Sequence, residues 1–167
     1  MTLKTPVYFD RLEHYKGAVG PTMEFGDLAG CLPTPKNIGW TLGNDCPYRC
    51  THCYSMNARE KGMNMSTTMV DRIVDQLASV GVETVNLGGN EPLFTNGINP
   101  KDTLLPYIIR RLNEAGIITG LTTSGITLLR LYRDHRESFD KLNDVDVSLD
   151  SPFRDEHNAN RGGNIYH

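Results

Sequence analysis

The 167-residue chain lacks several features that would place it in a special class of protein. It has no apolar run near the roughly 20 residues that span a bilayer, and its first residues lack the apolar core of a secretory signal. It contains no internal repeat and no low-complexity tract. Its net charge of -3 offers no basic surplus for nucleic acid. We therefore expect a cytoplasmic globular protein with no membrane partner and no clear nucleic-acid signal.

The composition is that of a folded chain. Apolar residues make up 38% and charged residues 22% of the sequence, whereas a disordered chain has fewer apolar residues and a larger net charge. The length suffices for one domain but falls short of the roughly 250 residues of a complete eight-stranded α/β barrel. Cysteine is scarce, with four residues. In a reducing compartment, ligands or free thiols are the favoured roles for them over disulfides.

The order of apolar segments predicts the fold. We interpret residues 1–36 as an N-terminal extension with little regular structure, followed by a domain over 37–167. Strand-like and helix-like segments then alternate, which favours an α/β fold with about four βα units and a parallel sheet. The polar stretch 150–167 stops where a further helix is expected, so we expect the fold to be incomplete at its C-terminal end. The predicted strands are 37–42, 83–87, 117–121 and 145–149, and the predicted helices are 66–80, 103–116 and 126–136.

A short loop after the first predicted strand carries three cysteines, Cys46, Cys50 and Cys53. Three thiols within eight residues can face one metal centre without a large fold around them. A cubane iron–sulfur cluster takes four ligands. Three protein thiolates therefore leave one iron open, and an open metal position is where a substrate binds. The loop would lie at the carboxyl rim of a parallel barrel, where active sites occur.

The cysteine spacing alone leaves other sites open. A structural zinc site or a closed electron-transfer cluster needs a fourth ligand, which Cys31, His14 or His52 would supply. The spacing has neither the paired two-residue gaps of zinc knuckles nor the gaps of a bacterial ferredoxin. A chance group of core cysteines is the remaining alternative.

At these residues the chain resembles the radical S-adenosylmethionine (SAM) superfamily, whose signature is C-x-x-x-C-x-aromatic-C. His52 stands at the aromatic position, and Tyr54 follows the last cysteine as a tyrosine often does in that family. The resemblance implies a partial (β/α)6 TIM-like barrel and a [4Fe-4S] cluster on Cys46, Cys50 and Cys53, with SAM on the open iron. It also implies an enzyme that cleaves SAM to a 5′-deoxyadenosyl radical, with a reductase such as flavodoxin or ferredoxin as electron donor.

The second predicted strand ends in Gly88-Gly89-Asn90-Glu91-Pro92. Paired glycines allow a ligand to approach the backbone closely, although a plain turn explains them as well. The segment resembles the family's G-G-E-P motif, which binds the amino group of SAM. It departs from that motif by the additional Asn90, so the assignment depends on Gly88 and Gly89 more than on Glu91.

Polar segments follow the later predicted strands. Thr123 and Ser124 resemble a T-N-G segment of the family, and they would either bind a ligand or cap the next helix. Ser148 and Asp150 resemble an S-x-D segment that lies near the ribose and the methionine carboxylate. Arg161 belongs to a stretch that looks like an H-x-x-x-R-G loop, and it would clamp a carboxylate or be a solvated loop arginine. Since all these strand ends fall on one face of a parallel barrel, we expect them to share one site with the cysteine loop.

The sequence indicates less about the substrate than about the cofactor. The layout resembles peptide maturases that epimerise or cross-link ribosomal peptides, so a peptide is our prediction. A small cofactor precursor, a sugar-like metabolite or a tRNA base are the alternatives. Cys31 stays open between a hydrogen-atom donor, a ligand of a second cluster and an incidental thiol.

Overall fold

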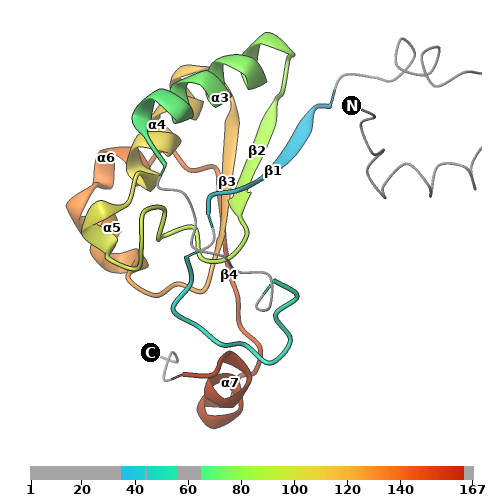
Figure 1. The fold of residues 1–167 in the computed structure, drawn as a ribbon, viewed down its shortest axis with the longest axis vertical. Helices are drawn as coiled ribbons and strands as arrows, with labels where there is room; N and C mark the ends of the chain where they lie inside the picture. Colours follow the sequence, from blue (N-terminus) through green and yellow to red (C-terminus); the bar gives the residue numbers. More distant parts are fainter. Residues whose placement is uncertain (1–34, 44, 56–64, 164–167) are drawn as a thin grey trace, which may run out of the picture. The chain divides into compact units, whose positions relative to one another are not determined.

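The computed structural model describes residues 35–43, 45–55 and 65–163. The predicted extension 1–36 lies almost wholly outside these residues, as do His14 and Cys31. The described strands form one parallel sheet in the order β1-β2-β3-β4 (Figure 1). Neighbours in the sheet are thus also neighbours along the chain, which is the winding of an α/β barrel and not that of a sheet with a switch point. The strands are β1 (Asn37–Thr41), β2 (Thr84–Gly88), β3 (Ile118–Thr123) and β4 (Asp144–Val147).

The connections carry helices, as the apolar periodicity predicts. Four of them, α3 to α6, lie on one side of the sheet in Figure 1. A short 3-10 turn, η3 (Pro100–Asp102), precedes α4, and Pro106 lies in the first turn of α4, where its missing N–H costs no helical hydrogen bond. The helices are α3 (Thr67–Ser79), α4 (Leu105–Glu114), α5 (Leu128–Asp134), α6 (Arg136–Phe139) and α7 (Arg154–Arg161).

Two helix predictions were wrong in detail. The single helix predicted over 126–136 is two short helices, because the backbone of His135 leaves the helical region between α5 and α6. The polar stretch after Asp150, in which we predicted no helix, contains α7. Acidic residues in its first turn and Arg161 in its last turn complement the helix dipole. The placement of charged residues therefore favours this helix. Its sequence lacks the apolar stripe by which an amphipathic helix is recognised.

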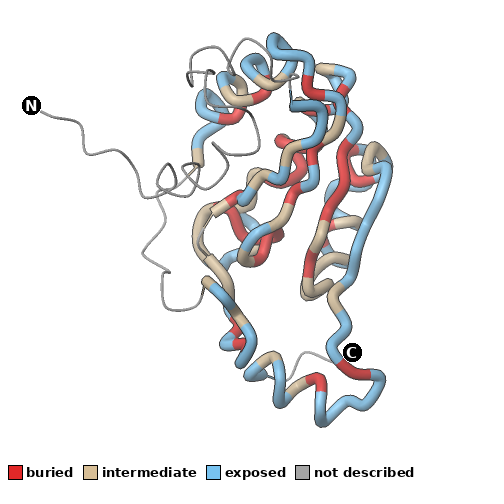
Figure 2. Tube along the Cα trace, turned by 90° about the vertical axis from the view of Figure 1, so that its right-hand side faces the viewer, coloured by how far each residue is buried: buried red, intermediate tan, exposed pale blue. Residues whose placement is uncertain are grey.

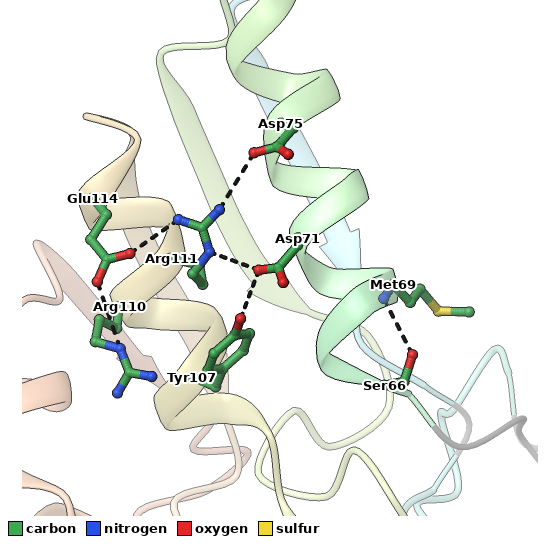
Figure 3. Close-up of polar contacts among 8 residues, drawn as sticks. All are labelled: Ser66, Met69, Asp71, Asp75, Tyr107, Arg110, Arg111 and Glu114. Carbon is green, nitrogen blue, oxygen red and sulfur yellow. Dashed lines mark hydrogen bonds and ion pairs between the residues drawn. The ribbon is translucent and has the colours of Figure 1, made fainter.

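Polar contacts join α3 to α4 on the outer surface (Figure 3). Ser66 caps α3, its side chain accepting the N–H of Met69 at 3.2 Å. Asp71 of α3 accepts hydrogen bonds from Arg111 Nε and from the Tyr107 hydroxyl, both at 2.7 Å. These two bonds hold the pKa of Asp71 below its usual value. The contacts fix how the two helices lie against each other.

The hydrophobic core fills the space between the sheet and these helices. Its fully buried members come from every layer and include Val70, Val74, Val85, Leu87, Ile108, Ile109, Leu112 and Leu121. Polar residues of three strands face the other way: Asn86 and Asp146 are exposed, and Thr122 lies between them. Figure 2 shows the buried positions of the inner strands and the exposed course of β4. Among the described helices, none has the length and apolar character to cross a membrane.

Candidate functional site

A cavity of about 250 Å³ lies where the carboxyl ends of the strands meet the cysteine loop. The structure brings all the predicted site residues to its wall except Gly88 and Asp150. It also adds three residues that the sequence analysis did not single out, Tyr48, Ser55 and Thr122. The full wall is Cys46, Tyr48, Cys50, His52, Cys53, Tyr54, Ser55, Gly89, Asn90, Glu91, Thr122, Thr123, Ser124, Ser148 and Arg161.

The three cysteines of the loop are free thiols that share this wall. Cys50 is buried, and Cys46 and Cys53 are partly exposed. Cys50 packs with Tyr48 in a small apolar cluster that the other two cysteines and Ile126 complete. The Cys53 N–H donates to the Cys50 carbonyl at 3.1 Å, which makes the loop tight. A compact turn thus presents three soft donors to one cavity.

The donor set fits an iron–sulfur cluster with three protein ligands. Within residues 35–43, 45–55 and 65–163, no three His, Cys, Asp or Glu side chains are grouped as a site for a single metal ion. Thiolates of a cubane cluster bind separate irons, so they surround a volume and need not converge on one point. Cys46, Cys50 and Cys53 would hold such a cluster, and the rest of the cavity wall would face its open iron.

Helix α7 is tied to the cysteine loop, although the two segments are far apart in the sequence. The N–H groups of Arg49 and Thr51 donate to the carbonyls of Arg161 and Asn160, at 3.3 and 2.9 Å. These carbonyls belong to the last turn of α7. Carbonyls in the last turn of a helix have no hydrogen-bond partner within that helix. Gly162 follows with a φ of 67°, and a Cβ there would lie 2.6 Å from the Arg49 carbonyl oxygen. The C-terminal end of α7 therefore holds the cysteine loop through backbone hydrogen bonds.

Arg161 binds a carboxylate of the protein itself, that of Asp150, through two hydrogen bonds. Burial alone would raise the pKa of Asp150, but the hydrogen bonds and charge of Arg161 outweigh it, helped by His52 and His157, so the pKa lies below its usual value. Burial likewise opposes the charge of Arg161, yet Asp150 and, to a smaller degree, Cys50 raise the pKa of the guanidinium. His52 Nε2 lies 3.8 Å from Asp150 Oδ2. Asp150 is thus placed behind Arg161 and does not line the cavity itself.

Glu91 is buried, with 3% of its surface exposed, and its carboxylate is engaged by the end of β3. It accepts hydrogen bonds from the Thr123 hydroxyl and from the Ser124 N–H, the latter at 2.9 Å. The Ser124 hydroxyl in turn donates to the Tyr48 hydroxyl at 3.3 Å. Burial raises the pKa of Tyr48 to about 12. This series of hydrogen bonds joins the ends of β2 and β3 to the cysteine loop.

The two glycines after β2 have different roles. A Cβ at Gly88 would meet Thr122 at 3.9 Å, which is ordinary contact. Gly89 has a φ of 98°, and a Cβ there would overlap the side chain of Thr41 at the end of β1. Only Gly89 therefore requires glycine, and it is also the one that lines the cavity.

The residues that sequence reasoning missed had weak local signals. Tyr48 lies between two cysteines of the loop, and in the sequence it looks like an ordinary apolar residue. Ser55 lies two positions after Cys53, beyond the cysteine motif. Thr122 precedes the predicted Thr123 and faces the opposite side of β3. Its position on the open face of the sheet follows from the alternation of a strand once the register is known.

Comparisons with known proteins show the family and the fold to which the chain is similar. A family model described as the Radical SAM superfamily matches residues 40–166. The PqqA peptide cyclase of Rhodopseudomonas palustris is 31% identical over 106 residues, which are 63% of this chain and 26% of that protein. The GTP 3′,8-cyclase of Synechocystis sp. is 31% identical over 116 residues, 66% of this chain and 32% of that protein.

The fold is similar to that of Streptococcus suis SuiB. In its crystal structure with the precursor peptide SuiA, SuiB is 19% identical, with a TM-score of 0.64 over 97% of this chain and 34% of SuiB. The structure of SuiB bound to S-adenosylmethionine gives a TM-score of 0.65. The chain thus spans between about a quarter and about a third of the length of these proteins.

Proposed function

Because the chain belongs to the radical SAM superfamily, we propose that residues 37–167 form the cofactor-binding part of an enzyme that cleaves SAM reductively. Cys46, Cys50 and Cys53 are the proposed ligands of its [4Fe-4S] cluster. When bound, such a cluster supplies the electron that splits SAM into methionine and a 5′-deoxyadenosyl radical, which takes a hydrogen atom from the substrate. The protein's part is to hold, orient and enclose these groups.

The shared cavity is the observation that carries this proposal. Three thiols of the loop after β1 and polar residues at the ends of β2, β3 and β4 line one wall. A structural zinc site or a closed electron-transfer cluster would need a fourth ligand in place of an open position. Neither would need Gly89, Ser148 and Arg161 around the thiols, whereas a cofactor with an amino group, a ribose and a carboxylate would.

The residues around the thiols have distinct proposed tasks. Gly89 leaves the backbone open to the amino group of SAM, and Thr123 and Ser124 are held at the wall by Glu91. Ser148 and Arg161 are the proposed ligands of the ribose and the carboxylate, and the hydrogen bonds of Asp150 would orient Arg161. His52 and Tyr54 belong to the cavity wall and are exposed. Tyr48 stays a neutral phenol at physiological pH, since its pKa is about 12.

A peptide is the proposed substrate, with epimerisation or cross-linking as the outcome. Support comes from the similarity to a peptide cyclase and from the fold shared with a peptide-binding enzyme. A flavodoxin or ferredoxin is the proposed electron donor. We place the enzyme in the cytoplasm, because free thiols and a cluster with an open iron need a reducing compartment.

A small nucleotide is the second candidate substrate. The observation that favours it is the 31% identity to a GTP 3′,8-cyclase over 66% of this chain. The two candidates separate in one assay of 5′-deoxyadenosine formation, run with a small-peptide fraction of the source cells and with GTP. The true substrate class accelerates SAM cleavage and changes in mass.

Anaerobic reconstitution with iron and sulfide tests the proposed function directly. The protein should bind four irons and four sulfides per chain and should release 5′-deoxyadenosine when given dithionite and SAM. Replacing Cys46, Cys50 or Cys53 by Ala should abolish cluster binding, whereas Cys31→Ala should retain it. Zinc without iron or sulfide in anaerobically prepared protein, or loss of the cluster in Cys31→Ala, would refute the three-thiol site.

A further inference from the structure

Asn90 is the residue by which the chain departs from G-G-E-P, and its side chain bonds both Gly43 and Ser55 at the cavity wall. Its Nδ2 donates to the Gly43 carbonyl at 2.9 Å. Its Oδ1 accepts the hydroxyl proton of Ser55 at 2.6 Å. The Ser55 oxygen lies 3.3 Å from the sulfur of Cys53. One side chain thus connects the loop after β1 to a serine that touches a proposed cluster ligand.

The orientation of the Asn90 amide is fixed by chemistry. The Gly43 carbonyl can only accept a hydrogen bond, so the nitrogen of Asn90 must face it. The oxygen of Asn90 consequently faces Ser55. A serine hydroxyl has a single proton, and the short contact to Asn90 uses it. In this arrangement the Cys53 thiol is the donor to Ser55.

Iron binding to Cys53 removes the S–H group, because the thiolate is the ligand. Ser55 then has one proton and two acceptors, the Asn90 oxygen and the Cys53 sulfur. Donation to the sulfur would leave the oxygens of Ser55 and Asn90 facing each other without a proton between them. The amide cannot reverse to relieve this contact, since its oxygen would then face the Gly43 carbonyl.

We infer that Asn90 holds the Ser55 hydroxyl away from the Cys53 sulfur and thereby keeps the reduction potential of the cluster low. Hydrogen bonds to cluster sulfurs are one of the factors that set this potential. Without the bond, the sulfur keeps its negative charge and the cluster remains a strong reductant. Asn90 is therefore a positioning residue that acts through Ser55. This inference rests on the proposed [4Fe-4S] site.

An EPR-monitored redox titration of the reconstituted protein, without SAM, tests the inference. The variants are Asn90→Leu, which removes the acceptor at similar volume, Ser55→Ala, and the two combined. Asn90→Leu should raise the midpoint potential, because the hydroxyl is then free to donate to Cys53. Ser55→Ala should match the wild type, and the double variant should match Ser55→Ala. Measured iron and sulfide contents confirm that equal clusters are compared.

Three results would overturn the inference. An unchanged potential in Asn90→Leu would mean that Asn90 does not direct the hydroxyl. A raised potential that persists in the double variant would mean that Asn90 acts through the loop and not through Ser55. A lowered potential in Ser55→Ala alone would mean that the Ser55 hydroxyl already donates to the sulfur in the wild type. This measurement tests the inference even if Asn90→Leu binds no cluster. Wild-type protein that binds no cluster would instead contradict the proposed function.

Discussion

The guanidinium of Arg161 donates two hydrogen bonds to the carboxylate of Asp150, from Nε to Oδ2 at 2.7 Å and from Nη2 to Oδ1 at 2.6 Å. The pair joins the segment after β4 to the last turn of α7. That same turn accepts the N–H groups of the cysteine loop. A contact between two residues of the C-terminal part therefore bears on the position of thiols about a hundred residues earlier in the sequence.

Asp150→Asn should lower the free energy of unfolding at neutral pH by about 1–2 kcal/mol, since a charge-assisted, two-bond contact is reduced to a neutral one. The pKa of Asp150 is lowered in the folded state, from an ordinary value of 3.8. The stabilisation is therefore present above that value and is lost as the pH falls through the lowered pKa. Denaturant unfolding of both proteins across this pH range measures the difference. A gap between wild type and variant that stays constant into strong acid would contradict the assignment.

Gly162→Ala should impair the cysteine loop more than a comparable glycine replacement elsewhere. Gly116 is the matched control, because it also follows a helix and has a φ of 74°, but a Cβ there would meet nothing within 4 Å. Both variants incur the cost of a left-handed alanine, about 1 kcal/mol. Only Gly162→Ala also pushes against the Arg49 carbonyl. We expect fewer irons and sulfides per chain after reconstitution in Gly162→Ala alone, and equal contents in the two variants would show that α7 does not support the loop.

The fold could be predicted where apolar residues mark the elements. Val70 and Val74 of α3, or Val85 and Leu87 of β2, repeat with the period of their element and face the core. Helix α7 escaped prediction because only His157 among its residues is buried. The break at His135 escaped because neither glycine nor proline marks it.

The residues that form the site could be predicted from the sequence, but the hydrogen bonds that join them could not. Strand ends of a parallel sheet meet on one side, so the common wall of Cys46, Gly89 and Ser148 follows from their positions after strands. The hydrogen bond from Arg49 to Arg161 and the Asn90 contact to Gly43 join distant segments. Such contacts depend on loop conformations that no local pattern encodes.

Tyr48→Phe should change the alkaline behaviour of the protein. Burial raises the pKa of Tyr48 from 10.0 to about 12, because the buried phenolate would lose its solvation, and the charge of Glu91 adds to this effect. A raised folded-state pKa means that the stabilisation is complete below pH 10 and declines as the pH rises towards 12. Wild-type protein should therefore lose unfolding free energy across this interval faster than Tyr48→Phe. The tyrosinate absorbance of wild type minus variant gives the titration of this one group, and a midpoint near 10 would contradict a buried phenol.

Gly89→Ala should weaken SAM binding by at least about tenfold, which corresponds to about 1.4 kcal/mol. The alanine would have to move away from Thr41, and the backbone that lines the cavity would move with it. Gly97→Ala is the control for backbone strain alone, since Gly97 has a φ of 80° and no atom within 4 Å of a built Cβ. Equilibrium dialysis of labelled SAM against reconstituted protein measures both variants at equal cluster content. Gly97→Ala should bind SAM as the wild type does. If Gly89→Ala did so too, the close approach of β1 and β2 would have no part in holding the cofactor, and the amino group would have to bind elsewhere on the wall.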